Sequence, residues 1–202
     1  RLMQSTFEAT FDGLSAFIRA DLQKGEEFTA GFVGEDSDFV RFNRGRVRQP
    51  GSVRQQVLSL RLISGQRAAS GDIALSGLPD EDRGRLGALL GRLRERLPLL
   101  PEDPHLLYAK EPHSTERLAQ NELPSAPDVV EELTGQLGPS EDLVGILAQG
   151  GVYRGFSAST GQRNWFSFFR QVVGEALLYS SSASVWSAQC GSSFPDSVER
   201  SR

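Results

Sequence analysis

The sequence contains few of the residues that build disulfides or metal sites. Its 202 residues include one cysteine, Cys190, and two histidines, His105 and His113. A single cysteine can form neither an internal disulfide nor a cysteine-rich zinc site. No stretch approaches the roughly 18 consecutive apolar residues of a membrane helix, and no secretory signal is visible at the start. We therefore expect a cytoplasmic protein with no membrane partner.

Lysine is also scarce, because Lys24 and Lys110 are the only two in the chain. Acidic residues number 26 against 22 basic ones, for a net charge of -4, which argues against a general nucleic-acid binder. Nearly all the positive charge is arginine, whose planar guanidinium matches carboxylates and phosphates. A cluster of arginines can therefore mark a binding site, although arginine-rich codon usage explains the same bias.

Residues 1–97 are expected to form an α+β domain, in the order helix, largely antiparallel β-meander, helix. Apolar residues at steps of three and four predict the first helix, lying on a sheet: Phe7, Phe11, Leu14, Ile18 and Leu22. Alternation over 26–75 predicts four or five strands, with turns at 34–37, 49–52 and 65–66. A leucine stripe after Pro79 predicts the second helix, ended by Pro98.

The rest of the chain changes character twice. Six of the ten prolines fall within 98–127, which predicts a stiff linker. Residues 128–180 are expected to form a partial β-rich domain, with a short helix over 128–136 and then four strands. Turns are predicted at Gly150-Gly151 and at Thr160–Gln162. The serine-rich segment 181–202 is predicted to be a disordered tail.

The first candidate site is a run of arginines without acidic neighbours. Between Asp38 and Asp72 there is no acidic residue, but there are seven arginines: Arg41, Arg44, Arg46, Arg48, Arg54, Arg61 and Arg67. A basic sheet face can hold phosphates or acidic peptides, and Phe39 and Phe42 could stack on bases. The alternative is a solvated face whose arginines pair with nearby carboxylates.

The sequence contains no complete catalytic site. His105 and His113 are eight residues apart within the proline-rich segment, so they cannot share a helix as paired zinc ligands do. Cys190 has no activating partner nearby, and no Gly-x-Ser-x-Gly elbow or phosphate-binding glycine loop occurs. We therefore predict no catalytic residue and no metal ligand in this chain.

Two segments resemble the TldD/PmbA family. Residues 39–49 (FVRFNRGRVRQ), followed by 55–67 (QQVLSLRLISGQR), resemble the first domain of that family. Residues 151–165 (GVYRGFSASTGQRNW) resemble its Arg-Gly-Phe and Gly-Gln-Arg segment. The two segments occur in the family's order, separated by a linker, and the resemblance covers about residues 5–180.

The resemblance implies a role in peptide processing. The family comprises zinc metallopeptidases and non-catalytic relatives that pair as a heterodimer. Its zinc-binding His-Glu-x-x-x-His motif lies downstream of the Gly-Gln-Arg segment and does not occur in these 202 residues. We therefore expect a truncated or frameshifted N-terminal fragment that is inactive alone and holds no cofactor, zinc being the cofactor of full-length members.

The expected partners are a peptide substrate or a paired family member, in a homodimer or a heterodimer. The candidate residues for peptide or partner binding are Arg41, Arg44, Arg46, Arg154, Gln162 and Arg163. The alternative function is a peptide- or acidic-partner-binding module. A nucleic-acid binder that uses the arginine-rich face ranks below it.

Overall fold

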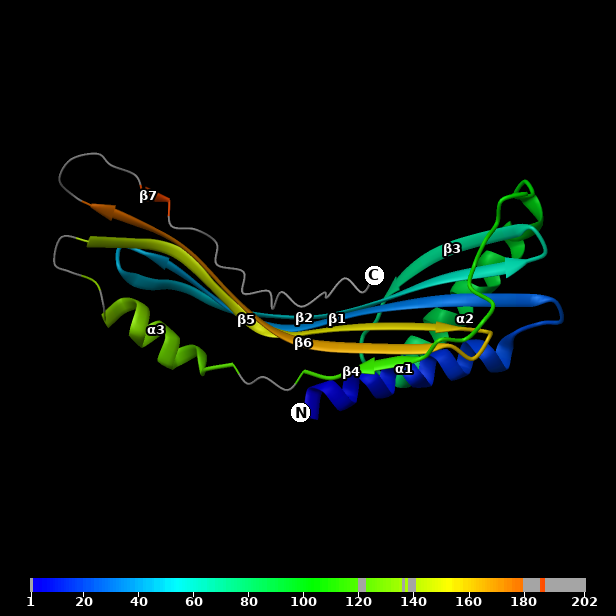
Figure 1. Cartoon of the computed structure of the whole chain (residues 1–202), viewed down its shortest axis with the longest axis horizontal. Helices are drawn as coiled ribbons and strands as arrows, with labels where there is room; N and C mark the ends of the chain where they lie inside the picture. Colours follow the sequence, from blue (N-terminus) through cyan, green and yellow to red (C-terminus); the bar gives the residue numbers. More distant parts are fainter. Residues whose placement is uncertain (1, 120–122, 136, 138–140, 180–185, 188–202) are drawn as a thin grey trace, which may run out of the picture. The chain divides into compact units, whose positions relative to one another are not determined.

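The computed structural model describes residues 2–119, 123–135, 137, 141–179 and 186–187 (Figure 1). In chain order the elements are α1 (Leu2–Asp21), β1 (Glu26–Asn43), β2 (Arg46–Ser64), β3 (Arg67–Ala74), α2 (Pro79–Arg96), the short 3-10 helix η1 (Leu97–Leu99), β4 (Thr115–Arg117), α3 (Ala126–Gly135), β5 (Glu141–Ala158), β6 (Arg163–Tyr179) and β7 (Trp186–Ser187). The expected α+β class is confirmed. None of the helices in this described part is long and apolar enough to cross a membrane.

The strands form one sheet in the order β3-β2-β1-β5-β6-β4, with β7 also paired to β6. β2 and β3 are antiparallel, from Val57 opposite Ala74 to Ser64 opposite Arg67. The predicted turn at residues 65–66 is confirmed, and Gly65 has the positive φ of 59° that glycine tolerates. β4 pairs with β6 in parallel.

The meander has three long strands rather than the four or five expected. β1 runs unbroken through Gly34–Ser37, and β2 runs unbroken through Gln49–Ser52, so the turns predicted there are wrong. Pro50 is tolerated because the β3 ladder begins only at Val57, which leaves this part of β2 unpaired by β3. Ser52, a residue type typical of turns, instead links β2 to β1, since its Oγ donates to Asp38 Oδ1 at 2.5 Å.

Residues 141–179 form two long strands, β5 and β6, rather than the four strands expected within 128–180. β5 continues through Gly150-Gly151, so the hairpin predicted at that pair is wrong. Gly151 is required there for another reason, because a Cβ at this position would collide with the Tyr153 hydroxyl. The turn predicted at Thr160–Gln162 is confirmed between β5 and β6. Both strands belong to the same sheet as β1, β2 and β3, with β5 beside β1.

The chain divides into two compact units that share these strands. The first comprises Arg1–Asp36, Val53–Glu122 and Gly151–Phe169, and the second comprises Ser37–Ser52, Leu123–Gly150 and Arg170–Arg202. The domain limits expected from the sequence at residues 97, 127 and 180 remain predictions. The predicted tail lies outside the described residues, apart from Trp186–Ser187.

The core of the first unit lies between its part of the sheet and the helices α1 and α2, which cover the same face (Figure 1). The predicted helical stripes are buried there. From the sheet come buried residues on β1, β2, β5 and β6, including Phe28, Phe32, Leu60, Tyr153 and Trp165. Trp165 is fully buried and stacks on Phe11, with ring centroids 5.5 Å apart.

The second unit has a smaller core beneath α3. Val129 of this helix packs with Val40 and Phe42 of β1 and with Leu143 and Leu147 of β5. The helix expected at 128–136 is therefore confirmed, with bounds of Ala126–Gly135. This core supports the tip of the hairpin between β1 and β2.

Candidate functional site

The β1–β2 hairpin closes through a two-residue turn in a left-handed conformation. Arg44 has φ 55° and Gly45 has φ 65°, as a type I′ turn requires. Glycine takes such a φ without cost, but an L-residue with a side chain is disfavoured there. Arg44 is the one non-glycine residue with positive φ in the described part of the chain.

The turn is held in place by contacts within the second unit. The backbone N–H of Gly45 donates to the carbonyl oxygen of Leu143 at 3.3 Å. A Cβ on Gly45 would lie 3.2 Å from Leu137 Cδ1, so the turn lies close to Leu137, two residues beyond the end of α3. The arginines at the tip therefore project from a supported backbone.

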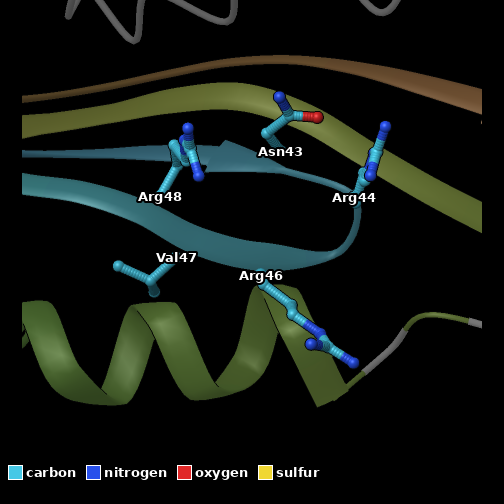
Figure 2. A pocket seen from close by; sticks show the side chains of 5 residues that line it. All are labelled: Asn43, Arg44, Arg46, Val47 and Arg48. Atoms are coloured by element: carbon cyan, nitrogen blue, oxygen red, sulfur yellow. The ribbon is translucent and has the colours of Figure 1, made fainter.

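A hollow of about 630 Å³ lies along this hairpin, lined by Asn43, Arg44, Arg46, Val47 and Arg48. Figure 2 shows that the side chains of Asn43, Arg44 and Arg48 extend on one side of the hairpin. Arg46 and Val47 extend on the other side, toward α3. All five residues are exposed.

The three arginines of the hollow form no ion pair with the described residues. The cause is compositional, because residues 39–52 contain four arginines and no acidic residue. Arg41, the fourth, does not line the hollow. Its guanidinium carbon lies 5.8 Å from the centroid of the Phe39 ring, a cation–π distance.

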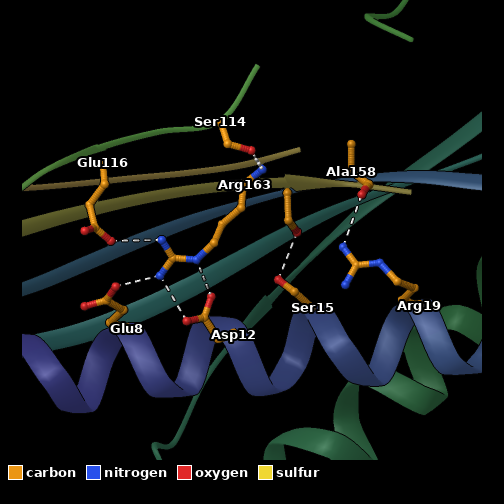
Figure 3. Close-up of polar contacts among 9 residues, drawn as sticks. Glu8, Asp12, Ser15, Arg19, Ser114, Glu116, Ala158 and Arg163 are labelled. Atoms are coloured by element: carbon orange, nitrogen blue, oxygen red, sulfur yellow. Dashed lines mark hydrogen bonds and ion pairs between the residues drawn. The ribbon is translucent and has the colours of Figure 1, made fainter. Parts of the chain in front are cut away.

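Arg163, a predicted binding residue, instead joins three carboxylates in the first unit (Figure 3). Its Nη2 donates to Glu8 Oε1 at 2.6 Å and its Nη1 donates to Glu116 Oε1 at 3.1 Å, while Nε and Nη2 both bond Asp12. The pKa of Arg163 is raised above its ordinary value, chiefly by the hydrogen bond to Asp12. The guanidinium therefore ties the start of β6 to α1 and β4.

Other residues of the segment 151–165 also contact α1. A Cβ on Gly155 would lie 3.0 Å from the Phe11 ring, so glycine permits the helix to approach. Ser157 Oγ and Ser15 Oγ share a buried hydrogen bond of 2.9 Å, and Arg19 Nη2 donates to the Ala158 carbonyl at 3.3 Å (Figure 3). Gly155 and Arg163 of the two motifs, with Ser157 and Ala158 between them, thus contribute to the helix–sheet interface of the first unit.

The two remaining predicted residues lie in this unit as well. Arg154 is exposed on β5, and Gln162 Nε2 donates to Asn164 Oδ1 at 2.7 Å. Arg44 and Arg46 are thus brought together in the second unit, and Arg154, Gln162 and Arg163 belong to the first. The binding role predicted for all six residues remains a prediction.

Sequence reasoning assigned neither Asn43 nor Val47 to the site, and it placed Arg48 in the run of arginines but not among the six predicted binding residues. The available signal was the sequence Asn43-Arg44-Gly45, because asparagine and glycine are typical of tight hairpins. A turn predicted there would have placed Asn43 and Arg48 on facing strands beside Arg44.

No group of three or more histidine, cysteine or acidic side chains in the described part could hold a metal ion. His105 and His113 are both exposed, and Cys190 lies outside the described residues. Zinc requires three or four converging ligands, so these histidines do not by themselves form such a site.

The chain is similar to three solved structures. The first is TldE from Thermococcus kodakarensis (TM-score 0.65, 11% identity, 87% of this chain and 40% of that chain). The second is a proposed modulator of DNA gyrase from Thermotoga maritima (TM-score 0.57, 11% identity, 86% and 40%). The third is a proposed modulator of DNA gyrase from Bacteroides thetaiotaomicron (TM-score 0.54, 12% identity, 88% and 42%).

These likenesses confirm the resemblance to the TldD/PmbA family at the level of the fold. No protein-family model matches the chain, and no curated protein matches it. The chain spans about 40% of the length of TldE.

Proposed function

We propose that this chain forms the N-terminal part of a TldD/PmbA-like protein that takes part in peptide processing. The observation that carries the proposal is the shared fold with TldE, which extends over 87% of this chain at a TM-score of 0.65. The two motif segments support it, since one contains the arginine hairpin and the other contributes to the interface with α1. In the family such proteins either cleave peptides with zinc or pair with a member that does.

The proposed role of these 202 residues is to bind and position rather than to cleave. Zinc-dependent hydrolysis needs protein ligands that converge on the metal and leave one position for the attacking water. The described residues contain no such group, and the His-Glu-x-x-x-His motif does not occur in the sequence. A family member that carries the motif is therefore the proposed partner.

The test combines metal analysis, a peptidase assay and a pairing experiment. We expect the purified chain to contain far less than one zinc ion per chain and to leave fluorogenic peptides intact. We also expect it to co-elute with the zinc-carrying family member of the same genome in size-exclusion chromatography with light scattering. One zinc per chain that is lost on replacing His105 or His113, or hydrolysis by the chain alone that a chelator stops, contradicts the binding role.

A further inference from the structure

The tip of the β1–β2 hairpin carries an arginine where the turn favours another residue. The left-handed φ of 55° at Arg44 suits asparagine or glycine, and Asn-Gly is the preferred pair for a type I′ turn. The Arg44 side chain has no ion pair among the described residues that would offset this backbone conformation. Strained residues of this kind concentrate at binding sites.

Arg44 is joined by two other donors on the same side of the hairpin. Asn43 and Arg48 extend beside it and line the same hollow of about 630 Å³ (Figure 2). Two guanidinium groups and one amide offer many N–H donors, and the only acceptor on these three side chains is the Asn43 amide oxygen. Such a group is suited to binding an external acceptor with negative charge.

Three arginines of the first unit, Arg67, Arg94 and Arg163, differ from those of the hairpin. Arg94 binds Asp21 and Glu26, Arg67 binds Glu102, and Arg163 binds three carboxylates. In each of these cases a carboxylate oxygen lies within 3.3 Å of a guanidinium nitrogen. Arg44 and Arg48 have no such carboxylate among the described residues, so they do not share the structural role of these three arginines.

We propose that Arg44 and Arg48, with Asn43, form a binding site for the carboxylates of an acidic peptide segment. The inference rests on the hairpin alone, so it stands or fails separately from the proposed role in peptide processing. Each guanidinium can bind one carboxylate through two parallel hydrogen bonds.

The size of the site fits a peptide. Arg44 and Arg48 are four residues apart, so their Cα atoms are separated by at most about 14 Å at the extended rise of ~3.4 Å per residue. An extended peptide of up to about four residues therefore spans the two Cα positions. Two acidic side chains on such a segment can reach both guanidinium groups.

The same surface is poorly suited to nucleic acid. Single-strand binders stack bases on open aromatic rings beside a basic groove. Phe42 is buried in the core of the second unit. The Phe39 ring lies so close to Gly51 that a Cβ there would be 2.7 Å from Phe39 Cε1, and Arg41 lies over this ring as well.

The experiment measures binding of fluorescein-labelled hexaglutamate to the full chain by anisotropy, at two salt concentrations. We expect binding that weakens with added salt, and hexalysine should not bind. The double variant Arg44→Asn with Arg48→Gln should bind at least about tenfold more weakly, because both guanidinium groups are lost. The matched control is Arg92→Gln on α2, an exposed arginine without an ion pair among the described residues, which should leave the affinity unchanged.

The variant Arg44→Asn keeps the test free of folding artefacts. Asparagine favours the left-handed turn, so its melting temperature should equal or exceed that of the parent chain while its affinity for hexaglutamate falls. The proposal is overturned if hexaglutamate does not bind, or if the double variant binds it as tightly as the parent chain. It is also overturned if labelled oligothymidine binds the hairpin more tightly than hexaglutamate does, or if inorganic phosphate binds as well as the peptide.

Discussion

Arg163 binds Asp12 through a two-point ion pair, with Nε 2.8 Å from Oδ1 and Nη2 3.0 Å from Oδ2. The two residues are 151 positions apart in the sequence. The pair connects the beginning of β6 to α1, and Glu8 adds a second carboxylate one helical turn away. The arginine of the Gly-Gln-Arg segment therefore has a structural task that its motif alone does not disclose.

We predict that Arg163→Gln lowers the free energy of unfolding by about 1–2 kcal/mol, because charge-assisted hydrogen bonds are lost and part of the site is open to solvent. Arg163→Lys should fall between the parent and Arg163→Gln, since lysine keeps the charge but not the planar fork. Urea unfolding monitored by tryptophan fluorescence, to which the buried Trp165 contributes, measures both. The control is Arg154→Gln, an exposed arginine of the same unit, and equal midpoints for Arg154→Gln and Arg163→Gln contradict the prediction.

A second prediction concerns pH and the ion pair between Arg94 and Glu26. Hydrogen bonds from Arg94 hold the pKa of Glu26 below its ordinary value of 4.5, and the Glu26 side chain is only 9% exposed. A carboxylate whose pKa is lowered by folding stabilises the folded state above its unfolded pKa. That stabilisation is lost as the pH falls through the lower, folded-state pKa.

We therefore expect Glu26→Gln to be less stable than the parent chain by about 1–2 kcal/mol at pH 7. The difference should shrink as the pH falls below 4.5, because the parent loses the ion pair as well. Thermal unfolding at a series of pH values provides the measurement, and Glu95→Gln, at an exposed position on α2, is the control. A difference that stays constant down to the acid-unfolding limit disproves this account.

The third prediction tests why glycine stands in the Arg-Gly-Phe segment. Gly155→Ala adds a Cβ 3.0 Å from three atoms of the Phe11 ring, which must then move within a packed core. We expect a loss of about 1–3 kcal/mol in the free energy of unfolding, the usual result of overpacking. Gly13→Ala on α1, where nothing lies within 4 Å, should instead stabilise by about 0.5–1 kcal/mol.

A double variant separates this steric effect from a change in strand propensity. Phe11→Leu makes room at the contact, so Gly155→Ala should cost less in that background than in the parent chain. Strictly additive effects of the two substitutions mean that the Phe11 ring is not the reason for the glycine.

The fourth prediction concerns the start of α2, where Asp82 is fully buried. Its Oδ1 accepts from the Ser76 N–H at 2.7 Å and its Oδ2 accepts from the Gly77 N–H at 2.9 Å. Asp82→Ala leaves these two donors without an acceptor, so we expect a loss of about 2–3 kcal/mol. Asp80→Ala, which removes only an exposed pair with Arg83, should change stability by less than about 0.5 kcal/mol. Equal effects of the two substitutions in urea unfolding contradict the role of Asp82 in joining β3 to α2.

Local sequence determined the helices and two of the turns. The stripe from Phe7 to Ile18 predicts α1, and the leucines after Pro79 predict α2, because helical periodicity depends on residues within two turns of one another. Glycine at positions 65 and 161 marks the turns that end β2 and β5, since both adopt a positive φ.

Tertiary structure decided the strands and the roles of the arginines. The turn-like residues of Gly34–Ser37 and Gln49–Ser52 remain extended because each strand is held by its neighbour in the sheet, and that pairing lies outside any local window. Arg44 and Arg163 are both arginines in segments that resemble the family, residues 39–49 and 151–165. Arg163 meets three carboxylates, the farthest of them 155 positions away in the sequence, whereas Arg44 lies in a hairpin without acidic residues. The sequence shows where each charged residue stands in the chain. Its partners depend on which distant segments the fold brings beside it.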